Sequence, residues 1–272
     1  MKNHRYLLPA GAFLVCVLGF PLAHTLWTAV SGAASVPRMA GDEILAQSVR
    51  VTLAFSLMSV ALELALGLVF ALLLNAPFRG RGWARAIVIL PWALPTAVMA
   101  MSWRWILNDT YGVFNDVLLR LGLIDAPVAW LGRPETAFAS IVLADVWKTT
   151  PFVTLILLAG LQSIPKDLYE ALRIDGAGAW SRFRLITLPM LRPAIALALT
   201  FRLIQALGVF DLVWVLTGGG PAGRTYTVSL YIYDNLFRYQ DPGYGAVITV
   251  TFMLSVFALA AVLSMGMQDR RA

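Results

Sequence analysis

The sequence has little charge and almost no cysteine or histidine, and these shortages exclude several classes of protein. Its single cysteine, Cys16, cannot build a disulfide framework or a Cys-x-x-Cys metal site. Its two histidines, His4 and His24, are too few for a multi-histidine metal site. Only 13% of its 272 residues are charged, whereas soluble domains carry about 25%. We therefore expect no bound metal. We also expect that much of the outer surface of the protein is not exposed to water.

Long apolar runs take the place of the missing charge. Hydrophobic residues make up 59% of the chain, and the mean hydropathy is +0.75. A helix needs about 20 apolar residues to cross the hydrocarbon core of a bilayer. Segments of that kind lie at about 6–30, 51–74, 86–107, 137–161, 194–217 and 243–266. The sequence predicts an all-α membrane protein of about six transmembrane helices, organised as one transmembrane domain over residues 1–272.

The first apolar segment and the charge distribution together predict the topology. Its apolar stretch is longer than that of a signal peptide, so we interpret it as a retained helix. With the N-terminus inside, twelve of the 21 Lys and Arg residues fall in inner connections and six fall in outer ones. Lys and Arg concentrate on the cytoplasmic side of membrane proteins. We expect cytoplasmic N- and C-termini, and the net charge of +6 needs no nucleic-acid partner.

The longest inner connection, residues 162–192, has the pattern of two short helices. Asp175-Gly176 supplies the turn between them, because glycine tolerates left-handed geometry. Leu188-Pro189 is expected to end the second helix near residue 187. Apolar side chains at helical spacing give this second helix one apolar face. That face is expected to pack either against the ends of the protein's own helices or against another subunit.

This connection carries the most specific motif in the chain. Glu170-Ala171 with Gly176 six residues after the glutamate, followed by Leu188-Pro189, resembles the EAA loop of ABC-importer permeases. Leu172 departs from the family's second alanine. In that family the loop docks on a cytoplasmic ATPase subunit and transmits its closure to the membrane helices. The resemblance implies coupling roles for Glu170, Ala171, Asp175, Gly176, Ala177, Trp180, Phe183, Leu188 and Pro189.

Three further stretches are similar to the carbohydrate-uptake branch of these permeases, the branch of the maltose and glycerol-phosphate importers. They are residues 147–152, 161–165 and 216–221, and the resemblance covers about residues 50–266. Val51 departs from an asparagine frequent in the branch. The resemblance implies a non-enzymatic permease subunit of a sugar, polyol or sugar-phosphate importer in a bacterial or archaeal cytoplasmic membrane. It implies as partners a second permease, two ATPase subunits that bind ATP and Mg, and an extracytoplasmic binding protein.

One stretch imitates a phosphate-binding loop. Gly218-x4-Gly223-Arg224-Thr225 matches G-x4-G-K-[ST] except that Arg224 replaces the lysine. A phosphate loop also needs a preceding strand, which a transmembrane helix cannot supply. We therefore expect no nucleotide or other cofactor on this chain.

Ionisable residues within the apolar segments are candidate functional groups, because charge is costly in a membrane. Asp145 and Lys148, three residues apart on one helix, form either a neutral structural pair or a substrate contact. Arg202 and Asp211 are expected to contact a partner helix or line a pathway. An alternative function, an ion-gradient-driven carrier, would use the carboxylates of Glu63, Asp145 and Asp211.

Aromatic and amide side chains are the candidates for contact with a sugar. Trp and Tyr also gather at membrane interfaces as anchors, and that reading competes with a binding role, most directly for Trp103. The predicted substrate pathway comprises Trp92, Trp103, Asn108, Trp147, Asp211, Tyr231 and Asn235.

Overall fold

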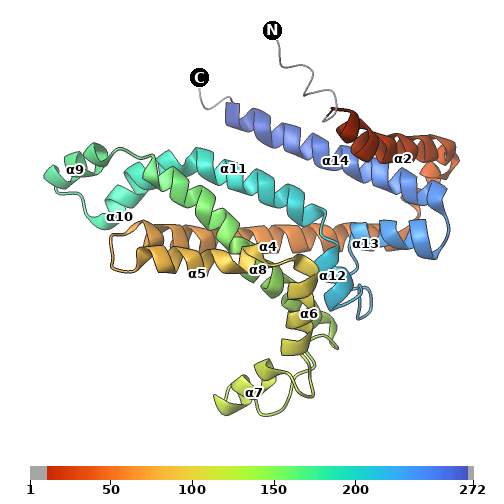
Figure 1. The fold of residues 1–272 in the computed structure, drawn as a ribbon, viewed down its shortest axis with the longest axis horizontal. Coiled ribbons are helices and arrows are strands. Elements are labelled where there is room, and N and C mark those ends of the chain that lie inside the picture. Colours follow the sequence, from red (N-terminus) through yellow and green to blue (C-terminus); the bar gives the residue numbers. More distant parts are fainter. Residues whose placement is uncertain (1–10, 269–272) are drawn as a thin grey trace, which may run out of the picture.

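The computed structural model describes residues 11–268, and within that range the regular structure consists of helices alone (Figure 1). Short π- or 3-10-helical turns, η1 (Val15–Gly19), η2 (Ala33–Ser35), η3 (Phe183–Thr187) and η4 (Asp234–Arg238), interrupt or join them. The α-helices are α2 (Phe20–Ser31), α3 (Val36–Ala40), α4 (Glu43–Asn75), α5 (Arg81–Ala93), α6 (Thr96–Ile106), α7 (Val113–Arg120), α8 (Pro134–Gln162), α9 (Lys166–Ile174), α10 (Ala179–Arg182), α11 (Leu188–Leu207), α12 (Asp211–Leu216), α13 (Val228–Tyr233) and α14 (Pro242–Gln268).

The predicted all-α architecture with about six apolar spans is confirmed. Five helical stretches among the described residues are long and apolar enough to cross a membrane: Gly11–Ser31, Glu43–Asn75, Pro134–Gln162, Ala179–Leu207 and Pro242–Leu263. The pair α5 and α6 makes a sixth only if it counts as one broken span. Residues 6–10 of the first predicted segment and the two chain ends lie outside the described residues.

Two predicted segments differ from the observed helices. The segment 86–107 is not one straight helix, because α5 and α6 meet at 95°. Pro95 disfavours helical geometry at the residue before it, and Leu94 accordingly has an extended backbone, with ψ at 137°. The segment 194–217 is wrong at both ends. Its helix begins at Ala179 and ends at Leu207, after which α12 runs as a separate short helix.

The core is formed by α4, α8 and α11, which cross one another at close range. Two glycines permit the approach. A side-chain carbon at Gly67 on α4 would lie 2.6 Å from a methyl of Val153 on α8. A side-chain carbon at Gly160 on α8 would lie 2.7 Å from Ala194 on α11. Small residues at helix crossings bring backbones together and raise dispersion contact, the main packing force inside a membrane.

The two ends of this core carry different elements. In Figure 1, α9 and α10 lie at one end of the long helices, and α13 lies at the other. The N-terminal helix α2 packs on α14, to one side of the core. The candidate sites below therefore occupy three separate places: the α9–α10 end, the middle of the core, and the α13 end.

Candidate functional site

Residues 166–187, which we call the α9–α10 knob, form a hinged projection at one end of the core. Helix α9 ends at Ile174, and Gly176 has a positive φ of 76°. The Gly176 N–H donates to the Arg173 carbonyl at 3.1 Å, and the Ala177 N–H donates to Leu172 at 2.9 Å. These bonds cap the helix in the geometry that glycine favours. The predicted turn at Asp175-Gly176 is confirmed.

The apolar face of the knob is divided between the protein's own core and the exterior. Ile186 and Thr187 are buried, and the Thr187 hydroxyl is 3.0 Å from the Tyr169 hydroxyl on α9. Trp180 is 72% exposed although it stacks on Phe183. Ile174 at the hinge is 87% exposed. The inner half of the face thus fixes the knob to its own helices, and the outer half presents large apolar groups without cover.

The second predicted helix does not stop at Leu188-Pro189, which corrects that expectation. The helical backbone runs without a break from Ala179 to Leu207. Pro189 sits in the first turn of α11, directly after the widened π-turn η3. A proline that would disrupt a regular α-helix is tolerated next to such a bulge, where the hydrogen-bond ladder is already shifted. The knob is therefore continuous with a core helix.

The other residues that the EAA resemblance singles out lie on the same surface. Glu170, Ala171 and Asp175 are exposed on α9 or just after it, and Ala177 is half-buried. Within residues 11–268, neither Glu170 nor Asp175 takes part in an ion pair. Their roles in coupling stay predictions, but their positions form one accessible patch with Trp180.

A buried charge cluster joins the three core helices. Arg202 on α11 donates two hydrogen bonds to Glu63 on α4 and a third, of 3.0 Å, to Asp145 on α8. Glu63 is fully buried, and Arg202 and Asp145 are almost so. Ser59 and Thr149 supply hydroxyls within hydrogen-bond distance of the Glu63 carboxylate, at 2.8 and 2.7 Å. We call Glu63, Asp145 and Arg202 the Arg202 cluster.

This cluster decides how the predicted intramembrane charges are used. Of the two alternatives for Asp145 and Lys148, the structural pair is wrong, because Asp145 pairs with Arg202 instead; contact of either residue with a substrate stays a prediction. In the described part of the chain Lys148 forms no ion pair. Arg202 does contact partner helices, as one of the two expectations for it stated. Asp211 is exposed at the start of α12.

The predicted substrate-pathway residues do not converge on one site. Trp103 and Trp147 meet edge to face, with ring centroids 5.9 Å apart, and Trp92 stacks on Phe152. Asn108 accepts hydrogen bonds from the N–H groups of Thr110 and Tyr111, so its amide shapes a local turn. Asp211 begins α12, which packs on α6, the helix that carries Trp103. Their contact with a substrate remains a prediction.

Tyr231 and Asn235 are buried, and their polar groups are engaged within the protein. Asn235 donates to the Tyr231 carbonyl at 2.8 Å. The Tyr231 hydroxyl, with that of Tyr244, donates to the Asp42 carboxylate that caps α4. Partial burial of Asp42 acts to raise its pKa, but these hydrogen bonds outweigh it and lower the pKa below its usual value. Burial and the bond to Asp42 raise the pKa of Tyr231 to about 12. The arrangement fastens α4 to α13 and α14.

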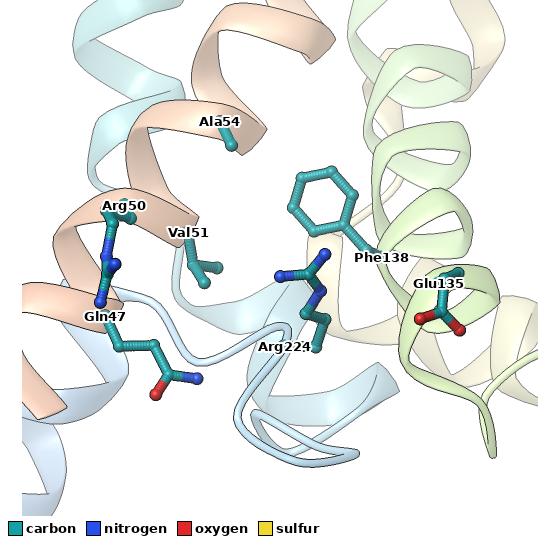
Figure 2. Close-up of a pocket in the computed structure, with 7 residues that line it drawn as sticks. All are labelled: Gln47, Arg50, Val51, Ala54, Glu135, Phe138 and Arg224. Atoms are coloured by element: carbon teal, nitrogen blue, oxygen red, sulfur yellow. The ribbon is translucent and has the colours of Figure 1, made fainter.

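A cavity of about 530 Å³, the α4–α8 cavity, opens at this same end of the core (Figure 2). Its wall combines charged, amide and apolar side chains from α4, α8 and the loop that precedes α13: Gln47, Arg50, Val51, Ala54, Glu135, Phe138 and Arg224. Figure 2 shows the Arg224 side chain reaching from the loop into the space between α4 and α8. Volumes of about 300–1,000 Å³ are typical of small-molecule sites.

Sequence reasoning missed this cavity. Arg224 was noticed only as the residue that spoils a phosphate-loop motif. Glu135 is far from Gln47 and Arg50 in the chain, and no spacing rule brings them together. The sequence offered only the position of Arg50 and Glu135 just before apolar runs, a position that ordinary solvated residues also occupy.

The chain matches one known protein family over most of its length. The profile of the family described as "Binding-protein-dependent transport system inner membrane component" matches residues 63–272. The trehalose/maltose transport system permease protein MalF of Thermococcus litoralis is 52% identical over 217 residues, which cover 79% of this chain and 72% of that protein. The sulfoquinovosyl glycerol transport system permease protein SmoG of Agrobacterium fabrum is 39% identical, over 94% of this chain and 87% of that protein.

A solved structure has the same fold. It is a chain of the bacterial alginate ABC transporter in complex with an alginate pentasaccharide-bound periplasmic protein, with a TM-score of 0.86 at 24% identity. The match covers 96% of this chain and 91% of that one. The profile match over most of the chain and the identity with its relatives agree with the helical architecture. The chain is therefore a multi-pass membrane protein that belongs to the family of binding-protein-dependent transport system inner membrane components.

Proposed function

We propose that this chain is a permease subunit of an ATP-driven importer of sugars or sugar derivatives. The curated relatives named above are permeases for trehalose and maltose and for sulfoquinovosyl glycerol. A third relative, the trehalose transport system permease protein SugA of Mycobacterium tuberculosis, is 35% identical over 94% of this chain. The importer would comprise a second related permease, two ATPase subunits carrying ATP and Mg, and an extracytoplasmic binding protein.

The α9–α10 knob carries the coupling part of this proposal. Trp180 and Ile174 present uncovered apolar surface beside the exposed Glu170, a combination that suits docking into an ATPase subunit. Helix α10 is continuous with α11, and α9 follows α8 after a short turn. A push on the knob would therefore move two core helices together. Closure of the ATPase pair on ATP would drive alternating access in this way, by rigid-body motion.

The test is co-purification and sugar uptake with a matched pair of tryptophan variants. Trp180→Ala should release the ATPase subunits and abolish ATP-dependent uptake, because it removes the largest exposed apolar group of the knob. Trp83→Ala is the control, since Trp83 at the start of α5 is 79% exposed but lies outside the knob. Equal ATPase binding by both variants would contradict the docking role. Uptake of amino acids or metal ions alone would contradict the substrate class.

The ion-gradient-driven carrier is not favoured. The family is one of binding-protein-dependent transport, and two of the three carboxylates that such a carrier would use are occupied by Arg202. Uptake that persists without ATP but collapses with the ion gradient would reverse this conclusion.

A further inference from the structure

The α4–α8 cavity contains charged groups that have no ion-pair partner. Within the described range, Arg50, Glu135 and Arg224 take part in no ion pair, although all three line one space. The Arg50 Nε donates to the Ala46 carbonyl of its own helix at 3.3 Å, and its side chain runs along α4 beside Gln47 (Figure 2). Two hydrogen-bond-donating cations and one accepting anion are thus available at the same place.

The loop that brings Arg224 into the cavity is held in position by specific contacts. Gln47 on α4 donates through its Nε2 to the Gly223 carbonyl at 3.2 Å, and a side chain at Gly223 would collide with that amide. The Thr225 hydroxyl donates to the Gly220 carbonyl at 2.8 Å, and Thr225 itself is fully buried. The backbone on both sides of Arg224 is anchored, so its guanidinium enters the cavity from a fixed base (Figure 2).

The composition of the lining selects a class of ligand. Sugar hydroxyls both donate and accept hydrogen bonds, and they match a wall that offers guanidinium donors and a carboxylate acceptor. Phe138 adds one aromatic ring, against which the C–H face of a pyranose packs. The Glu135 carboxylate offsets one of the two arginine charges and accepts hydrogen bonds from hydroxyl groups, which a neutral sugar carries.

We propose that the α4–α8 cavity binds a neutral mono- or disaccharide through Arg50, Glu135 and Arg224, with Phe138 as the ring contact. This rests on the proposed function, since a sugar must reach the permease for the site to be used. The cavity lies at the end of the core opposite the knob, so it would receive the sugar before the core helices open.

The experiment measures binding of radiolabelled trehalose and maltose, and of glucuronate as an anionic probe, to the purified complex in nanodiscs without its binding protein. Arg224→Ala and Glu135→Gln should each weaken binding of a neutral sugar by about tenfold or more, the usual effect of losing a charged hydrogen bond. Arg133→Ala is the control, because this exposed arginine precedes α8 without lining the cavity. It should bind like the wild type.

The Glu135→Gln variant distinguishes a neutral ligand from an anionic one, because it should weaken binding of the first and strengthen binding of the second. Weaker sugar binding supports the proposal, whereas tighter glucuronate binding with unchanged sugar binding means that the site takes anions and overturns it. Unchanged sugar binding in both variants, or no binding to the wild-type complex, also overturns it. The proposal is also overturned if Arg224→Ala or Glu135→Gln changes only the concentration of binding protein needed to stimulate ATP hydrolysis. The cavity would then be a contact site for the binding protein. Failure of the wild type to import any sugar with ATP contradicts the proposed function instead.

Discussion

Removal of the Arg202 guanidinium tests whether buried charge balance holds the core together. Arg202→Met leaves the fully buried Glu63 and the nearly buried Asp145 with no cation between them. It also removes the hydrogen bond of 2.8 Å to Gln205. Breaking a buried ion pair by deleting one partner costs about 3–5 kcal/mol. For a chain of this size each kcal/mol lowers the melting temperature by about 2–4 °C. We expect a loss of about 6–20 °C.

Two further variants separate charge balance from packing. Glu63→Gln leaves one cation opposite one anion, and its amide can still accept from Arg202. We expect it to cost only about 1–2 kcal/mol. The triple variant Glu63→Gln, Asp145→Asn, Arg202→Met contains no charge and should recover most of the lost stability, because uncharged replacements of a buried ion cluster are often near neutral.

The assay is thermal unfolding of the purified complex in detergent, followed by size-exclusion chromatography. Arg202→Met melting within about 2 °C of the wild type would show that the cluster contributes little. A Glu63→Gln variant as unstable as Arg202→Met would show that hydrogen-bond geometry, and not the balance of charge, is the cause. Either result would refute the reasoning.

Three more predictions concern other parts of the fold. Gly67→Ala should cost about 1–3 kcal/mol, because its new methyl collides with Val153, whereas Gly82→Ala, with open space around it, should be neutral or stabilising in the same melting assay. Asn115→Ala should speed trypsin cleavage after Arg120, because the buried Asn115 amide holds the backbone of Val128 and the Trp130 indole; digestion at the wild-type rate would contradict this. The lowered pKa of Asp42 implies stability that is fully present above its unfolded value of 3.8 and is lost as pH falls through the lower folded value. Melting curves from pH 6 down to about 3 should show this loss in the wild type, and a smaller one in Asp42→Asn.

Hydropathy and turn chemistry predict the parts of this fold that depend only on residues close together in the sequence. A run of about 20 apolar residues excludes itself from water wherever it lies in the chain, and the spans were found on that ground alone. Gly176 placed the hinge of the knob because a positive φ is a property of one residue. The same kind of local rule placed a helix end at Pro189 and was wrong there, because the widened turn that accommodates this proline depends on packing around η3.

Tertiary structure alone decided which distant groups meet. Asp145 has Lys148 one helical turn away, yet it pairs with Arg202, 57 residues along the chain. Glu63 and Arg202 are 139 residues apart, and only the crossing of α4, α8 and α11 brings them together. The α4–α8 cavity likewise joins two helix ends and an anchored loop. Sequence determined the membrane-spanning helices and the knob because those signals are local, whereas ion pairing and cavity shape arise from contacts between segments and appear only when the chain is folded.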